Sequence, residues 1–325
     1  MLISGGRLSP EQVSLFNEDG YLIIDNVFDP ADLEPIRLDL EREIDRKLAQ
    51  MLDDGKLSQT YPEASFEQRV TRIYHDSREN GEEVLRHLEG ARGGGYQGRC
   101  LFDLITHPKL LDVVSDLIGP EIVASSAYRI RPKISGVGRG DVPWHQDSGY
   151  FAPHCDRHLI LTCWIPLVDA TVENGCMEII PKSHKSGIFR HHTGGNMGLY
   201  VIKDEDLPAT QRNKVAAECP RGGVVLMTNL TAHCSTPNYS DTIRWSLDLR
   251  YQSADAPNNV NLWPGSSESH ADANTQIACY PPEADFIVRS SNSPESVVDY
   301  DGFVSRRAAY EDLGIASPRQ WAPIS

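Results

Sequence analysis

A histidine and an aspartate separated by a single residue constrain this chain more than any other feature of its sequence. They are His145 and Asp147. On a β-strand, alternate side chains project from the same face, so an imidazole and a carboxylate at this spacing can converge on one metal ion. The alternative is that Asp147 opens a turn with Ser148 and Gly149. Two ligands do not hold a catalytic ion, so a metal site also requires a third ligand from elsewhere in the chain.

His233 is the candidate for the third ligand. It comes shortly after a hydrophobic run, residues 224–230, that follows a Gly-Gly turn and is typical of a strand. Two histidines and one carboxylate form the facial triad of non-haem Fe(II) oxygenases, which leaves positions open for a cosubstrate and O₂. In zinc sites, a fourth protein ligand more often completes the coordination, or cysteines hold the ion. His145, Asp147 and His233 are therefore a candidate iron(II) site.

Two arginines lie on the strand that we expect next. Residues 242–251 alternate apolar residues with smaller or polar ones, which is typical of a strand with one buried face. Arg244 faces away from the apolar set, where its guanidinium can bind a carboxylate through two parallel hydrogen bonds. Arg250 has the same place in the alternation and is a competing candidate, since either arginine could be solvated or structural.

The pattern of short strands indicates the fold class. Strand-like segments recur at residues 122–124, 128–131, 159–167, 177–180, 224–228 and 243–251. Many short strands separated by turn residues predict a β-sandwich or jelly-roll. Nearer the start, Ser9 with Pro10 and Gln12 marks the beginning of a helix, and residues 33–48 carry an apolar stripe at helical spacing. We therefore expect a mainly β protein with flanking α-helices.

In their order and spacing, these motifs resemble the phytanoyl-CoA dioxygenase family of Fe(II)- and 2-oxoglutarate-dependent oxygenases. The residues that carry the resemblance are Trp144-His145-Gln146-Asp147, residues 173–184, His233, Asn238 and Arg244, with residues 16–24 at the start. The likeness covers the chain from about Leu8 to Tyr251. It implies a double-stranded β-helix, the jelly-roll core of cupin-like proteins, with the metal in its mouth.

The resemblance also implies roles for individual residues. His145, Asp147 and His233 would be the catalytic ligands of Fe(II), and Arg244 would bind the distal carboxylate of the cosubstrate 2-oxoglutarate. One position departs from the family: where several relatives have a polar or thioether contact to the cosubstrate, this chain has Ala127. The neighbouring tyrosine, residue 128, is the candidate substitute.

Five further residues are candidates for binding. Trp164 aligns with an aromatic residue of the cosubstrate pocket in some relatives, and Thr162 and Ser235 are plausible hydroxyl partners for the same carboxylate. For these three residues, packing inside the barrel is the alternative. Tyr150 and Phe151 follow the His-x-Asp motif, where relatives place aromatic contacts to the substrate.

The reaction that the resemblance implies is the oxidative decarboxylation of 2-oxoglutarate with O₂, coupled to hydroxylation of an unactivated C–H bond in a small molecule. Related halogenases have Ala or Gly at the position of Asp147, so hydroxylation is favoured here, while desaturation, epoxidation and cyclisation stay open. We expect a natural-product or amino-acid-like substrate, as in secondary metabolite biosynthesis. A function of another class, a non-oxygenase cupin-like barrel that binds a metal or a sugar, would need neither Arg244 nor an open coordination position.

Charge and cysteine content limit the partners and the compartment. The chain has 31 Lys and Arg against 46 Asp and Glu, a net charge of −15. A protein with this negative net charge is not attracted to nucleic acid or to anionic membranes, so neither is expected as a partner. The sequence has no signal-peptide pattern, no apolar run long enough for a membrane helix and seven cysteines without a C-x-x-C pair. We expect a cytoplasmic protein that acts on a small molecule and could form a homodimer.

We expect one oxygenase domain over residues 1–325. Residues 1–120 would form a helical flank, in which residues 53–99 could act as a lid. Residues 121–252 would form the jelly-roll core that carries the metal site. Residues 253–325 would form a C-terminal extension with a short helix near its end, which wraps the barrel, forms a dimer contact or helps to close the substrate pocket.

Overall fold

The computed structural model of this chain describes residues 6–90, 95–151, 153–195, 198–207, 213–254, 256, 285–312 and 319–324. About half of the expected C-terminal extension, mainly residues 257–284 and 313–318, lies outside the described residues. The short helix expected near its end is present at Tyr300–Asp312.

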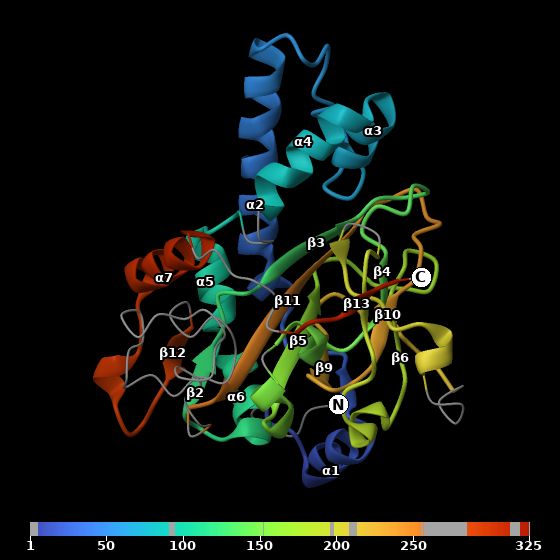
Figure 1. The fold of residues 1–325 in the computed structure, drawn as a ribbon. Helices are drawn as coiled ribbons and strands as arrows, with labels where there is room; N and C mark the ends of the chain where they lie inside the picture. The colour runs from blue at the N-terminus through green and yellow to red at the C-terminus, as the bar shows by residue number, and fades with distance from the viewer. Residues whose placement is uncertain are drawn as a thin grey trace.

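Two antiparallel sheets form the centre of the protein (Figure 1). The larger has seven strands in the order β1-β9-β5-β11-β2-β12, with β3 paired to β11, and the smaller has four in the order β4-β10-β6-β8. The strands are β1 (Tyr21–Ile24), β2 (Ile122–Ala124), β3 (Arg129–Lys133), β4 (Val142–His145), β5 (Ile160–Pro166), β6 (Met177–Ile179), β7 (His192–Thr193), β8 (Val215–Ala217), β9 (Val224–Thr228), β10 (His233–Ser235), β11 (Arg244–Ser253), β12 (Phe286–Arg289) and β13 (Ala322–Pro323). Strands β7 and β13 form a separate parallel pair. The prediction of a mainly β fold with flanking helices is confirmed.

The helices lie at the N-terminal side of the sequence, apart from one near its end. They are α1 (Pro10–Asp19), α2 (Pro30–Asp53), α3 (Arg69–Asp76), α4 (Arg78–Glu89), α5 (Arg99–Ile105), α6 (Pro108–Ile118) and α7 (Tyr300–Asp312). Short 3₁₀ turns occupy Asp147–Tyr150, Pro153–Arg157, Ser183–Ser186, Asp204–Asp206 and Pro294–Ser296. Ser9 caps α1 through the predicted capping box with Gln12, and Gly20 ends it at φ +80°, a left-handed conformation that glycine adopts without strain. Within the described residues, no helix is long and apolar enough to cross a membrane.

Strand β11 has two different faces, and this difference positions the site. One face carries apolar side chains, which belong to the same core as the apolar stripe of α2: Trp245, Leu247, Leu249 and Tyr251. The alternate positions carry polar side chains: Arg244, Ser246, Asp248 and Arg250. Because neighbouring side chains on a strand project to opposite faces, the polar set lies on the side of the sheet away from the helices.

The two sheets pack against each other on that side. Trp164 and Met227 of the larger sheet form an apolar cluster with Met177 and Ile179 of the smaller sheet. The polar face of β11 therefore lies between the sheets, where it can line a cavity. Strand β1 at one edge of the larger sheet and β12 at the other come from outside residues 121–252, so both flanks of the expected core contribute to the sheet.

Candidate metal centre and its two cavities

The pairing of two short strands brings the predicted metal ligands together. His145 ends β4 and His233 begins β10, and the two residues are direct partners in the antiparallel register. Their ring centroids lie 4.2 Å apart. Asp147 begins a 3₁₀ turn just after β4. One ligand atom from each of the three residues lies within 4.8 Å of the others, and all three side chains are buried.

The route by which His145 and Asp147 converge differs from the prediction. We expected both on one strand, but β4 ends at His145 and Asp147 opens a 3₁₀ turn. The turn and the metal site were alternatives in the sequence, and the structure combines them. The tight turn swings the carboxylate back toward the imidazole, so that His145 Nε2 lies 3.8 Å from Asp147 Oδ1.

Backbone carbonyls fix which nitrogen of each histidine is available. His145 Nδ1 lies 2.9 Å from the carbonyl oxygen of Pro143, and His233 Nδ1 lies 2.9 Å from that of Thr231. A carbonyl only accepts hydrogen bonds, so each Nδ1 carries the proton and each Nε2 keeps its lone pair. Burial lowers the pKa of His145 well below its ordinary value, so its ring is neutral. Two neutral imidazole nitrogens and one carboxylate are the donor set of a facial triad, which fits iron(II).

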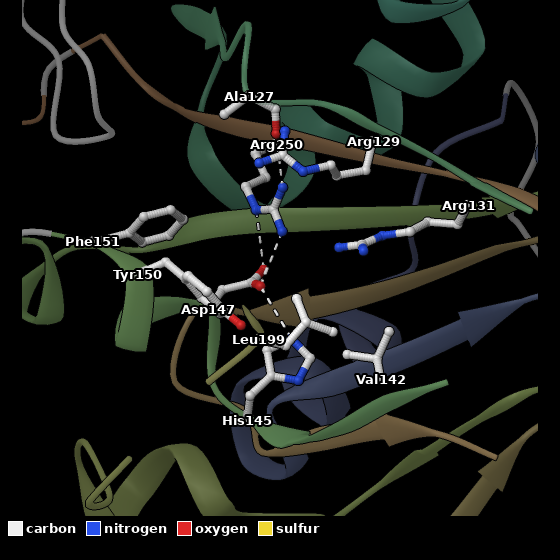
Figure 2. A pocket seen from close by; sticks show the side chains of 10 residues that line it. All are labelled: Ala127, Arg129, Arg131, Val142, His145, Asp147, Tyr150, Phe151, Leu199 and Arg250. Atoms are coloured by element: carbon white, nitrogen blue, oxygen red, sulfur yellow. Dashed lines mark hydrogen bonds and ion pairs between the residues drawn. The ribbon is translucent and has the colours of Figure 1, made fainter. Parts of the chain in front are cut away.

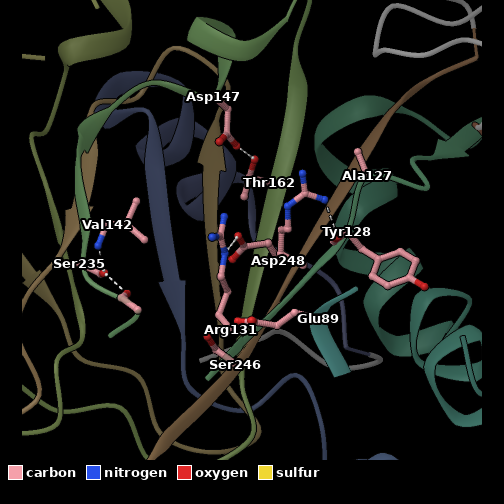
Figure 3. Close-up of polar contacts among 12 residues, drawn as sticks. Glu89, Ala127, Tyr128, Arg131, Val142, Asp147, Thr162, Ser235, Ser246 and Asp248 are labelled. Carbon is pink, nitrogen blue, oxygen red and sulfur yellow. Dashed lines mark hydrogen bonds and ion pairs between the residues drawn. The ribbon is translucent and has the colours of Figure 1, made fainter. Parts of the chain in front are cut away.

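Asp147 is held by two side chains of the larger sheet (Figures 2 and 3). Arg250 donates from Nε to Oδ2 at 3.2 Å and from Nη2 to Oδ1 at 3.0 Å, and Thr162 donates its hydroxyl to Oδ2 at 2.5 Å. Burial raises the pKa of this carboxyl, but the charge and hydrogen bonds of Arg250, together with the nearby His233 and His145, lower it by more, so the pKa lies below its ordinary value. Asp147 is therefore an ionised carboxylate in a fixed orientation.

Arg244 lies in a cavity that it shares with His145, His233, Trp164 and Ser235. Its side chain is almost fully buried, at 2% exposure. Its Nη1 donates to the Ser246 hydroxyl at 2.8 Å, and its guanidinium carbon lies 5.1 Å from the ring centroid of Trp164. Its Nε has no hydrogen-bond partner in the described part of the chain, and no carboxylate there lies within ion-pair distance of it. Burial lowers the pKa of Arg244 to about 10, so the group is charged at neutral pH.

The other predicted cosubstrate residues lie in different places. Trp164 and Ser235 line the cavity of Arg244. Ser235 Oγ accepts from Lys133 Nζ at 2.9 Å and from the Val142 amide at 3.0 Å. Thr162 does not line that cavity. Its hydroxyl donates to Asp147 instead.

A second cavity shares Arg131, Val142 and His145 with the first, and it is also lined by the two aromatic residues predicted to contact substrate. The Tyr150 ring stacks on that of Tyr200 with centroids 4.5 Å apart, and Phe151 lies with its ring centroid 6.0 Å from the guanidinium carbon of Arg250. Both residues are thus placed at a cavity wall.

The suggestion that Tyr128 replaces the missing contact of Ala127 is wrong. Tyr128 is buried among the helices, where its hydroxyl donates to the carbonyl of Tyr96 at 2.7 Å. Ala127 itself lines the second cavity, and its carbonyl accepts from Arg250 Nη1 at 2.9 Å.

Four charged residues near the site were not candidates from sequence: Arg129, Arg131, Lys133 and Asp248. Arg131 donates from Nε to Asp248 Oδ2 at 2.8 Å (Figure 3). Lys133 is fully buried. The available signal was the alternation of Arg129 and Arg131 in the strand expected at 128–131, which places both side chains on one face.

Known proteins resemble this chain over most of its length. The family described as phytanoyl-CoA dioxygenase (PhyH) matches residues 16–246. A probable phytanoyl-CoA dioxygenase of Caenorhabditis elegans is 25% identical over 283 residues, which cover 84% of this chain and 85% of the relative. The peroxisomal phytanoyl-CoA dioxygenase of Homo sapiens is 27% identical over 260 residues, which cover 76% of this chain and 69% of the relative.

Two solved structures share the fold. The apo form of the non-heme monooxygenase ThoJ superposes with a TM-score of 0.53 at 20% identity, covering 92% of this chain and 96% of the other. The epimerase SnoN, in complex with Fe³⁺, alpha ketoglutarate and nogalamycin RO, gives a TM-score of 0.51 at 18% identity, covering 86% and 98%. At these identities the likeness concerns the fold, and it confirms the predicted cupin-like class.

Proposed function

We propose a reaction for this chain from the premise that it belongs to the phytanoyl-CoA dioxygenase family. Membership makes it an Fe(II)- and 2-oxoglutarate-dependent oxygenase. The reaction that we propose is the hydroxylation of an unactivated C–H bond in a small molecule, with succinate and CO₂ released from 2-oxoglutarate.

His145, Asp147 and His233 are the residues that would hold iron(II). Their ligand atoms lie close together, and the two histidines present unprotonated Nε2 atoms because each Nδ1–H is bound to a carbonyl. Iron(II) bound there, together with 2-oxoglutarate and O₂, supplies the oxidation of the C–H bond. Three protein ligands leave the remaining coordination positions open.

The observation that carries this function is the buried guanidinium of Arg244. Its Nε has no partner and no carboxylate of the described residues pairs with it, although a buried charge without a partner costs several kcal/mol or more. A ligand of opposite charge would remove that cost. The same cavity reaches His145 and His233, so a dicarboxylate such as 2-oxoglutarate can bind Arg244 at one end and approach the metal ligands with the other.

The chain's own side chains prepare the site for this ligand. Arg250 and Thr162 keep Asp147 ionised and fix its orientation, so that the carboxylate is ready to bind a cation. Trp164 forms an apolar wall beside the guanidinium of Arg244 and excludes water from that end of the cavity. We assign Ser235 a polar contact at the same end, and we assign Thr162 to Asp147.

The substrate would occupy the second cavity. Tyr150 and Phe151 line it next to the metal ligands, which supports a small natural-product or amino-acid-like substrate. Because Asp147 occupies a ligand position that related halogenases leave open, we propose hydroxylation over halogenation.

Anaerobic titration of the Fe(II)-loaded protein with 2-oxoglutarate tests this function. The visible charge-transfer band of an iron-chelated 2-oxo acid should appear in the wild type, disappear in His233→Ala and require far more 2-oxoglutarate in Arg244→Ala. The control is Arg86→Ala, which removes an exposed arginine from α4 and should leave the band unchanged. No band in the wild type, with zinc found by metal analysis, would favour the non-oxygenase barrel instead.

A further inference from the structure

The cavity beside Asp147 is lined by three arginines (Figure 2). Arg129 and Arg131 lie on β3, and Arg250 lies on the neighbouring β11. In the figure, the guanidinium groups of Arg131 and Arg250 point into the cavity from the larger sheet, across from His145. Three cationic side chains in a single cavity are unusual for a chain whose net charge is −15, so overall composition does not account for them.

Two of these arginines have carboxylate partners. Arg250 binds both oxygens of Asp147. Arg131 donates only from Nε to Asp248, at 2.8 Å, and its two terminal nitrogens have no partner within the described ranges. Arg131 therefore presents free hydrogen-bond donors toward the cavity, although its charge is paired.

Arg129 has no carboxylate partner among the described residues. Its hydrogen bond there runs from Nη1 to the carbonyl of its neighbour Tyr128, at 3.0 Å. Its side chain is partly buried and lines the cavity. A charge in this position is incompletely hydrated and uncompensated, so an anion that enters the cavity gains from it.

The charge around the two cavities remains positive when the cofactors are included. The cationic side chains are Arg129, Arg131, Lys133, Arg244 and Arg250, and the carboxylates are Asp141, Asp147 and Asp248. Iron(II) and the 2-oxoglutarate dianion cancel each other in charge. The site loaded with iron and 2-oxoglutarate thus keeps an excess of positive charge. Arg244 is the one of these cationic side chains that is already assigned to 2-oxoglutarate.

Building on the proposed function, we propose that the substrate is a small organic anion whose carboxylate or phosphate group is bound by Arg129 and the terminal nitrogens of Arg131. Guanidinium groups suit these anions because they donate two parallel hydrogen bonds. The apolar part of the substrate lies against Val142 and Leu199, which line the same cavity. The carbon to be oxidised then lies on the side of His145.

Isothermal titration calorimetry with matched probes tests this assignment. Octanoate, octyl phosphate and octanol are titrated into anaerobic protein loaded with Fe(II) and 2-oxoglutarate. We expect one of the two anions to bind about 10- to 100-fold more tightly than octanol, since hydrogen bonds to charged groups contribute about 1.5–3 kcal/mol. The tighter anion shows whether the group is a carboxylate or a phosphate.

Variants locate the effect. Arg129→Met should lose the preference for the anion, and Arg129→Lys should keep part of it, because the charge remains without the fork of two donors. Arg86→Met, at an exposed position of α4, should keep the full preference. Equal binding of all three probes, no binding of either anion, or a preference that persists in Arg129→Met would overturn the proposal.

The proposed function is tested separately on the same wild-type sample. If the 2-oxoglutarate charge-transfer band is present while the anion preference is absent, only the anionic substrate is refuted. If the band itself is absent, the oxygenase assignment fails, whatever the probes do.

Discussion

Arg244 and Arg250 lie on the same face of one strand and have opposite surroundings. Arg250 donates to both oxygens of Asp147 and to the carbonyl of Ala127. Arg244 is more deeply buried, yet within the described part of the chain its hydrogen-bond partner is the neutral hydroxyl of Ser246, and its Nε has no partner there. In sequence the two arginines are equivalent candidates for binding a carboxylate.

The difference separates an arginine that binds the protein's own carboxylate from one that can bind a ligand. A buried guanidinium paired with a buried carboxylate holds that carboxylate in place, and losing either partner leaves an uncompensated charge. A buried guanidinium without a carboxylate is already uncompensated, so its removal costs the empty protein little and the ligand complex much. This contrast can be measured.

The largest effect is expected for Arg244→Ala. The concentration of 2-oxoglutarate that half-saturates the Fe(II) protein should rise about 10²- to 10³-fold, because truncating one partner of a buried charge pair costs about 2–5 kcal/mol. Thermal unfolding of the protein without cosubstrate should show only a small loss of stability, since the variant loses the hydrogen bond to Ser246 but no protein ion pair. A large loss of stability with unchanged binding would reverse the roles that we assign to the two arginines.

Arg250→Met should have the opposite profile. Asp147 loses its ion pair, so the free energy of unfolding should fall by about 3–5 kcal/mol and the affinity for Fe(II) by about 10- to 100-fold. Once iron is bound at saturating concentration, half-saturation by 2-oxoglutarate should change little. Denaturant unfolding and an anaerobic Fe(II) titration measure the two quantities, with Arg86→Met as the control. The contrast between the arginines would be lost if 2-oxoglutarate binding suffered as much as in Arg244→Ala.

Thr162→Val should give a smaller effect of the same kind as Arg250→Met. It removes the hydroxyl that donates to Asp147 while Arg250 remains in place. We expect the free energy of unfolding to fall by about 1.5–3 kcal/mol, the usual contribution of a hydrogen bond to a charged group. Thr162→Ser keeps the hydroxyl and should restore most of this stability. If Thr162→Val instead weakened 2-oxoglutarate binding alone, the original assignment of Thr162 to the cosubstrate would be correct.

The smallest effect concerns pH at the Arg244 end of the site. Burial lowers the pKa of Lys133 to about 8, and the positive charge of Arg244 acts in the same direction. The ammonium is charged below this pKa and neutral above it, so a dianion bound nearby should bind more tightly below pH 8. If 2-oxoglutarate raises this pKa by about one unit, its half-saturating concentration should rise about fivefold between about pH 7 and pH 9. A flat profile would show that the charge of Lys133 does not act on this ligand.

Much of the site could be predicted because it depends on local spacing. The alternation in residues 242–251 placed Arg244 and Arg250 on the face opposite Trp245, as the structure confirms. The His-x-Asp motif with His233 gave a group of residues that the structure does bring together. The strand segments and the capping box at Ser9 were also set by local preferences.

Other features depended on how distant segments meet. Asp147 reaches its position through a 3₁₀ turn, and its partner Arg250 lies 103 residues further along the chain. Thr162 was assigned to the cosubstrate, but the packing of the sheets brings its hydroxyl to Asp147. No local pattern specifies such contacts, because they depend on the register and approach of two sheets.

The sequence by itself determined which side chains can take part in the site, since alternation along a strand is a property of the backbone. Only the tertiary structure decided which of them pair with each other. In the folded protein Asp147 pairs with Arg250, while Arg244 has no carboxylate partner among the described residues. Arg129 and Arg131 line the second cavity. The physical reason is that the state of a buried charge depends on what lies within a few ångströms of it, and that neighbourhood exists only once the two sheets have packed together.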